Sequence, residues 1–413
     1  MPRSTMHKTV FASLFAIVVS GLGYLAYSIP AVRQFAAGVV LGPSVKTSEA
    51  SKWLPLDTDL SSHVRIAAET LCTGAGNSQD DMFGYSSHLS DLRGLDLMVT
   101  AAPATEIILQ KTEGWETGSG TVPGYPAVIV DHTTDDDTVR MFYSVHDAPA
   151  GIGLANSESI LGQFEKVAVT NLFWADSRIL KAPRRPVGTS HFSSPSVVWD
   201  EDARLWRLYF HYYASEVARG FGHQKTTVAS THDLGGADWE IHSDESGNYI
   251  ATHLVDPDWG ASQSSYHVVA RIGQNAWVSL MRGTNTKKDS LGVETPYETS
   301  IAIAISYDGL QWSRLTDKPI DRNQLSEGVL QPVNIACTSD GILSLIWYNR
   351  PSSEDGSGYL LAAPLANPFD STKILPGLEL TETSASIFRS KNSVVIFHGN
   401  RRDTLELPPT NAN

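Results

Sequence analysis

The sequence predicts an all-β fold, a five-bladed β-propeller, and three observations lead to it. From residue 60 onward, no long stretch keeps the 3.6-residue period of a helix. Short apolar and aromatic runs recur instead, separated by Gly, Asp, Asn and Ser. These runs form a unit of about 50–70 residues that occurs five times, which is typical of a repeat architecture. A two-sheet sandwich with coincidental spacing is the alternative.

The composition is that of a globular protein. The chain has 413 residues, of which 41% are hydrophobic and 18% are charged, so it can bury a large core. The formal net charge is -14, and no basic face is visible in the sequence. Because nucleic-acid binding needs a basic surface, we expect no nucleic-acid partner.

The amino-terminal residues 9–32 contain no charged side chain, and Arg3 and Lys8 precede them. An apolar stretch of about twenty residues spans a bilayer and keeps its basic flank in the cytoplasm. We therefore expect a signal anchor, or a signal peptide that is cleaved after Ser28.

These features predict the domains and the location. Residues 1–32 form the anchor or signal, residues 33–60 a stem rich in Gly, Pro, Ser and Ala, and residues 61–413 the propeller. We expect the propeller on the exported side of a membrane, in a periplasm, at a cell surface or in a secretory lumen. It is secreted if the segment is cleaved.

The chain contains two cysteines, Cys72 and Cys337. Two cysteines exclude a disulfide-rich scaffold and a thiolate metal site. One bridge between them is compatible with an exported protein, but their wide separation in the sequence favours two free thiols.

Each repeat begins with a predicted β-hairpin. A strand opens after Ser or Pro, a polar turn follows, and a second apolar strand returns. The five predicted hairpins open close to residues 124, 193, 265, 330 and 383.

A strand of small residues that ends in a tight polar turn follows the first four hairpins. A fifth copy of this outer element lies at 82–99, before the first hairpin, and none follows the last hairpin at 383–402. We therefore expect one shared blade, with inner strands from the carboxyl end and outer strands from 82–108. Such a blade closes the ring and removes open sheet edges.

Three features carry a family resemblance: strand openings at Pro126 and Pro195, Tyr-rich second strands, and a Ser-x-Asp-Gly-x-x-Trp turn at 306–312. Through them residues 62–407 resemble the five-bladed propeller glycosidases around glycoside hydrolase families 43, 32, 68 and 117. The resemblance implies a carbohydrate ligand at the axial mouth and hydrolysis of a glycosidic bond. The turn itself is interpreted as structural and remote from the site.

The resemblance also implies an Asp at the opening of the first blade, an Asp in the second and a Glu in the third. The sequence departs from this pattern. The openings read Gly124-Tyr125-Pro126, His191-Phe192-Ser193-Ser194-Pro195 and Ser264-Ser265-Tyr266-His267. They contain no acid, so a non-catalytic propeller that binds a glycan or a protein is the alternative.

Glycoside hydrolysis needs one group that donates a proton and another that activates water or attacks the sugar. In a propeller, the start of each first strand and the end of each second strand meet on one face, the mouth. Four residues near this face are candidate catalytic groups: Glu327 before the fourth inner strand, His191 as an acid, Asp147 as a base, and Glu298 in a loop of the third blade.

Arg282, Arg350 and Arg401 occupy the same predicted repeat position on three successive second strands. Arginine binds a carboxylate or a sulfate through two parallel hydrogen bonds, so an anionic glycan is the expected ligand. The other predicted substrate-binding residues on this face are His146, His211, Tyr213, His267 and Gln331.

We predict no metal and no cofactor. Asp135-Asp136-Asp137 lacks the alternating spacing of a calcium loop and is interpreted as solvated turn acids. The sequence defines no protein partner. A sialidase-like enzyme, which needs an arginine triad and a tyrosine paired with Glu, is a further alternative. The prediction of five blades instead of six disfavours it.

Overall fold

The structure is a computed structural model, and its described residues are 57–73, 84–93, 104–112, 116, 122–133, 138–145, 151–167, 192–214, 223–235, 238–243, 263–288, 290, 294–352, 358–369, 372–375, 385–389 and 393–406. The predicted membrane segment 9–32 lies outside them. Within the described residues, no helix has the length and apolar character that crossing a bilayer requires.

Five sheets form five blades, numbered here in chain order. Blade 1 contains β3 (Gly124–Asp131), β4 (Thr138–Val145), β5 (Gly151–Ser157) and β6 (Glu165–Lys166). Blade 2 contains β7 (Phe192–Asp200), β8 (Leu205–Ala214), β9 (His223–Thr231) and β10 (Glu240–Ile241). Blade 3 contains β11 (Gln263–Gly273), β12 (Ala276–Lys288), β13 (Glu294–Ser306) and β14 (Ser313–Arg314), with β15 (Asp321–Gln324) also on β13.

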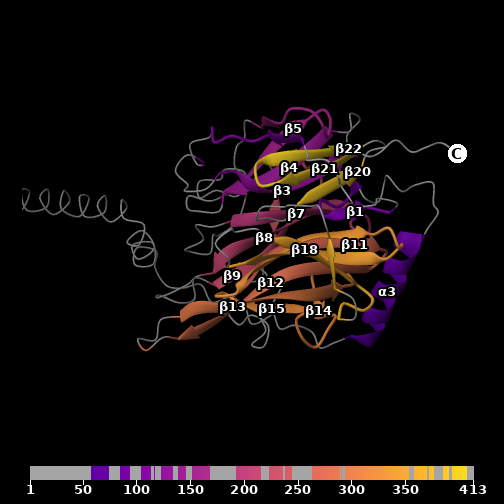
Figure 1. The fold of residues 1–413 in the computed structure, drawn as a ribbon. Coiled ribbons are helices and arrows are strands. Elements are labelled where there is room, and N and C mark those ends of the chain that lie inside the picture. Colours follow the sequence, from indigo (N-terminus) through magenta and orange to yellow (C-terminus); the bar gives the residue numbers. More distant parts are fainter. Residues whose placement is uncertain are drawn as a thin grey trace, which may run out of the picture.

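Blade 4 contains β16 (Gly328–Cys337), β17 (Leu343–Pro351), β18 (Tyr359–Pro364) and β19 (Lys373–Leu375). Blade 5 contains β20 (Ser386–Arg389), β21 (Ser393–His398) and β22 (Arg401–Glu406), with β2 (Ala104–Ile107) as its outer strand. The first strands of the blades contact one another in ring order, and Figure 1 shows β20–β22 beside β3 and β4. The predicted five-bladed propeller and its five hairpins are therefore confirmed.

Ring closure differs from the prediction in its details. The turn at Gly399 and Asn400 sends the chain back as β22, so the last hairpin does have a third strand. One outer position remains, and β2 fills it by antiparallel pairing with β22. The predicted blade shared by both ends of the chain is confirmed, because β2 lies inside the predicted range 82–108, but residues 84–93 of the predicted copy at 82–99 do not belong to it.

Residues 84–93 run along the propeller axis instead. β1 (Leu89–Asp91) pairs in parallel with β16 of blade 4. The Ser86 hydroxyl donates to the carbonyl of Val269 in blade 3, and the Ser90 hydroxyl donates to the carbonyl of Ile387 in blade 5. One short segment thus joins several blades and fills the axis.

The helix α3 (Thr58–Thr73) lies against the strand ends of blades 3 and 4 (Figure 1). It begins inside the range predicted as a stem. Its buried residues Leu60, Val64 and Ala68 pack into the largest apolar core. Cys72 at its carboxyl end forms a disulfide with Cys337 of β16, so the expectation of two free thiols was wrong. The fold, not the sequence separation, brings their Cα atoms to 5.4 Å.

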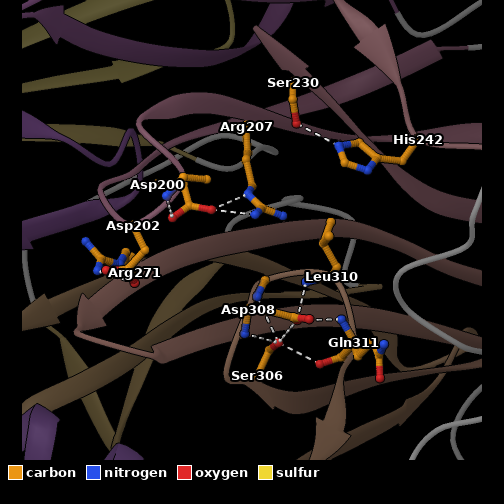
Figure 2. A network of polar contacts seen from close by, with 12 residues as sticks. Asp200, Asp202, Arg207, Ser230, His242, Arg271, Ser306, Asp308, Leu310 and Gln311 are labelled. Carbon is orange, nitrogen blue, oxygen red and sulfur yellow. Dashed lines mark hydrogen bonds and ion pairs between the residues drawn. The ribbon is translucent and has the colours of Figure 1, made fainter. Parts of the chain in front are cut away.

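We call the face that carries the hairpin turns the back face. Two buried ion pairs close hairpins there: Arg140 Nε lies 2.6 Å from Asp131 Oδ2, and Arg207 Nε lies 2.8 Å from Asp200 Oδ2. Figure 2 shows the second pair and the turn after β13. In that turn the Asp308 carboxylate accepts backbone N–H groups at 2.8 Å, which agrees with its predicted structural role.

Candidate functional site

The first strands of blades 1, 2 and 3 open at the mouth with the same backbone irregularity. The hairpin register shifts there in each blade, as in a β-bulge. Tyr125, Ser194 and Tyr266 have φ values of 52°, 56° and 49° at these positions. A side chain other than Gly pays about 1–2 kcal/mol for this left-handed conformation. Such strain tends to be kept where function requires it.

Hydroxyl groups brace these openings from the neighbouring blade. The Ser144 and Ser193 hydroxyls lie 2.9 Å apart, and the backbone N–H of Ser194 donates to Ser144 Oγ at 3.2 Å. Between blades 2 and 3, the Thr226 hydroxyl donates to the carbonyl of Ser264 at 3.1 Å. The strained openings are therefore held in fixed positions.

Tyr266 brings together residues from three blades. Its ring centroid lies 5.6 Å from that of Tyr125 in blade 1 and 4.9 Å from that of His211 in blade 2. The guanidinium carbon of Arg282 lies 3.7 Å from the Tyr266 ring centroid, a close cation–π contact. Tyr266 is 6% exposed and His211 is fully buried, so the cluster forms a packed floor.

Arg282 also contacts blade 4, where its Nη1 donates to Gln331 Oε1 at 3.3 Å. Its Nε and the Nε2 of Gln331 are buried, and among the described residues neither has a hydrogen-bond acceptor. No carboxylate of the described residues forms an ion pair with Arg282. A buried donor without an acceptor is costly, so this pair of side chains is suited to a ligand that supplies oxygen atoms.

Two buried histidines lie close to this cluster, His267 in β11 and His88 in the axial segment. The Nδ1 of His267 lies 3.2 Å from Thr226 Oγ1, and burial lowers the pKa of His267 to about 3. His88 of the axial segment contacts Ser87 and Ser196, and burial together with the nearby His267 lowers its pKa to about 3. Both imidazoles are neutral at pH 7 and are poor proton donors there.

Glu298 lies in β13 rather than in the predicted loop, three residues nearer the mouth than Ile301, which pairs with Arg282. It is 6% exposed. Its Oε1 accepts a hydrogen bond from Asn285 at 2.9 Å and lies 3.3 Å from Arg322 Nε. Its Oε2 accepts one from Gln324 at 3.3 Å. These contacts hold the Glu298 carboxylate in place at the rim of the mouth.

The other predicted residues on this face are less buried. Glu327 is exposed, and its Oε2 accepts the backbone N–H of Gln324 at 3.3 Å. Arg350 is half-buried on β17. Arg401 is exposed and is the first residue of β22, so the prediction that it ends a second strand was wrong. The turn at Gly399 and Asn400 shortens the strand before it.

Some predictions fall where the structure gives no side chain. His191, Asp147 and His146 lie outside the described residues, as do Asp135-Asp136-Asp137. Tyr213 is placed by its backbone, which pairs with Gln224 across blade 2. Their roles stay predictions.

One pair at the mouth was not predicted. His398 at the end of β21 lies with its Nε2 2.9 Å from Asp403 Oδ2, and both residues are buried. His398 Nδ1 and Asp403 Oδ1 have no hydrogen-bond partner among the described residues. Asp403 was missed because the repeat pattern predicted no strand at 401–406. The described residues contain no cluster of three or more His, Cys, Asp and Glu side chains that would hold a metal ion.

No protein-family model matches the chain. No curated protein matches it in sequence. Its fold is similar to that of solved structures. The structure of a complex of BT0996 with RGII has a TM-score of 0.50 and 13% identity, over 74% of this chain and 91% of that chain.

Two further similar structures are glycoside hydrolases. Zg3597, a family 117 glycoside hydrolase from Zobellia galactanivorans, has a TM-score of 0.43 and 12% identity over 73% of this chain and 90% of that one. The Bombyx mori family 32 β-fructofuranosidase BmSUC1 has a TM-score of 0.44 and 10% identity over 66% of this chain and 58% of that one. The five-bladed architecture that the resemblance implies is the one observed, and the similarity to the BT0996 structure is one of fold alone.

Proposed function

We propose that this glycoside hydrolase-like propeller acts on an anionic oligosaccharide or polysaccharide at its mouth. The observation that carries the proposal is the pair Arg282 and Gln331, whose buried Nε and Nε2 atoms have no acceptor among the described residues. A carboxylate or sulfate group on a sugar supplies such acceptors, and the guanidinium charge favours an anion. The half-buried Tyr125, which packs against Tyr266, provides aromatic surface for the sugar ring next to it.

For hydrolysis we propose Glu298 as the essential carboxylate. Its burial and its hydrogen bonds to Asn285 and Gln324 hold it in one orientation, as a base or a nucleophile requires. Glu327, another carboxylate predicted from the sequence, is exposed and is a weaker candidate. The second catalytic group would come from His191 or Asp147.

A specific observation favours the alternative of a non-catalytic glycan-binding propeller. Tyr125, Ser194 and Tyr266 occupy the three strained openings, where the resembling families carry acids. A mouth that keeps the shape of a glycosidase site without its acids still binds a sugar.

The test combines hydrolysis with binding. The protein is incubated with neutral, uronic and sulfated oligosaccharides, and products and affinities are measured for the wild type, Glu298→Gln and the matched control Glu327→Gln. We expect turnover of a uronic or sulfated substrate that falls at least about a hundredfold in Glu298→Gln and stays within about twofold in Glu327→Gln.

Turnover that survives in Glu298→Gln would remove this residue from the mechanism. Binding without turnover in the wild type would establish the non-catalytic alternative. The affinity of the Arg282→Gln variant for the anionic ligand should fall at least about tenfold. Arg401→Gln, which replaces an exposed arginine, serves as the control. Equal binding by both variants would exclude Arg282 as the anion contact.

We also propose that the propeller functions on the exported side of a membrane. The apolar segment 9–32 and the buried Cys72–Cys337 disulfide support this location, because such bridges persist in oxidising compartments. Recovery of the protein in a cytoplasmic fraction with both thiols reduced would contradict it.

A further inference from the structure

A hollow lies on the back face, between blades 2 and 3. It has a volume of about 320 Å³, within the usual range for small-ligand sites. Its wall is made by the start of the axial segment, the end of β7 and the turns that follow β7 and β11. The lining residues are Tyr85, Trp199, Glu201, Asp202, Arg271, Gly273 and Gln274.

One wall of the hollow is aromatic. Tyr85 and Trp199 are half-buried, so each keeps an exposed part toward the hollow. Their ring centroids lie 6.2 Å and 5.0 Å from that of the buried Trp206, which fixes both rings from behind. A fixed aromatic surface of this kind packs against the apolar C–H face of a sugar ring.

The other wall is polar. Arg271 Nη2 donates to Asp202 Oδ2 at 2.9 Å, and Figure 2 shows this pair at the edge of blade 2. Glu201 Oε2 lies 4.0 Å from Arg271 Nη1. The Nε of Arg271 is buried and has no acceptor among the described residues. Donors and acceptors therefore stand side by side, as recognition of sugar hydroxyls requires.

The lining of this hollow has an excess of negative charge. Glu201 and Asp202 are acids and Arg271 is the one base in the lining. The excess of negative charge disfavours carboxylated or sulfated ligands.

The helix α3 packs against one side of the hollow. His63 Nε2 lies 2.9 Å from the carbonyl of Gln274 in the turn after β11. A Cβ atom added to Gly273 would lie 3.1 Å from Ala67 Cβ, so helix and turn are in close contact. A site formed before the ligand arrives loses less entropy on binding.

We propose that this back-face hollow is a second carbohydrate-binding site that takes a neutral sugar unit of a glycan. The sugar packs on Trp199 and Tyr85, and its hydroxyls bond to Asp202 and Arg271. The site is independent of the mouth in its residues and prefers a different ligand charge. A glycan with neutral and anionic units would be held by both faces.

The experiment uses the full-length protein and isothermal titration with neutral tetra- to hexasaccharides of glucose, xylose, galactose and mannose. Tryptophan fluorescence is recorded in parallel, because Trp199 lines the hollow. We expect at least one of these neutral probes to bind. Asp202→Asn should weaken this binding at least about tenfold, since a charged hydrogen-bond acceptor is lost.

Asp202 is 47% exposed, so its substitution should not disturb folding. Arg282→Gln at the mouth is the matched control and should leave the affinity for neutral probes within about twofold. Trp199→Phe keeps an aromatic ring at this position. It should change the affinity for the neutral probe and reduce the change in tryptophan fluorescence on binding. Three results would overturn the proposal: no neutral probe binds, Asp202→Asn binds as well as the wild type, or Arg282→Gln alone abolishes binding. The proposal for the mouth is decided by turnover and binding of uronic or sulfated probes, so failure with neutral probes leaves it unaffected.

Discussion

The mouth and the back face of the propeller are built from the same hairpins but differ in how far their buried polar groups find hydrogen-bond partners. On the back face, Arg207 pairs with Asp200 and the Asp308 turn satisfies its backbone N–H groups (Figure 2). At the mouth, Ser194 and Tyr266 are strained, and Arg282 Nε is buried without an acceptor among the described residues. The hairpin turns of the back face are arranged for stability, with Arg271 in the hollow as an exception, whereas the mouth bears unmet interactions, which are typical of a binding site.

The largest expected effect comes from the axis that joins the two faces. His88 and His267 have folded-state pKa values of about 3, well below the ordinary 6.5. As the pH falls below 6.5, the unfolded chain takes up protons that the folded chain does not. The free energy of unfolding should therefore fall between pH 6.5 and 3, by up to about 1.4 kcal/mol per pH unit for each histidine.

Urea unfolding at pH 7.5, 6.5, 5.5 and 4.5 measures this slope. Above pH 6.5 these two groups contribute no pH dependence. The His88→Asn variant should have a shallower slope than the wild type, because one of the two neutral imidazoles is gone. The same slope in both proteins would contradict the role of His88.

The second effect comes from removing a buried ion pair on the back face. Asp200→Ala removes the partner of a buried guanidinium and should lower the free energy of unfolding by about 3–5 kcal/mol. The neighbouring Asp202→Ala removes the partner of Arg271 from an exposed position and should cost no more than about 1 kcal/mol. Denaturant unfolding of the two variants makes the comparison. Similar losses would show that burial of the pair does not matter.

The smallest effect has the opposite sign and lies at the mouth. Ser194→Gly relieves a left-handed φ and removes a buried hydroxyl that has no partner among the described residues. It should raise the free energy of unfolding by about 1 kcal/mol. Ser193→Gly, which breaks the contact with Ser144, should lower it by a similar amount. A loss of stability in Ser194→Gly would mean that the opening is not strained.

The sequence was sufficient for the hairpins because each depends on local signals: an apolar run, a polar turn and a second apolar run. It was not sufficient for β1, a strand of three residues whose parallel pairing with β16 depends on the assembled ring. The Cys72–Cys337 bridge was missed for the same reason. Contacts between distant segments leave no periodic signal in a single sequence.

The candidate site was predictable to a similar degree. Strand order alone placed Arg282, His211 and Gln331 on one face. The stacking of Arg282 on Tyr266 and the left-handed openings depend on how three blades pack together, which strand patterns do not encode. Arg401 was misplaced because a two-residue turn ended its strand early.

The strand pairs that close the ring also determine at which stage of synthesis it can close. β1 and β2 are synthesised before blade 1, yet their partners β16 and β22 are among the last strands to be made. During translation β1 and Cys72 have no partner until β16 has been made, and β2 has none until β22 has been made. A chain that stops before residue 401 lacks the partner of β2. Ring closure therefore waits for β22 and depends on contacts of very long sequence separation, which makes it slow.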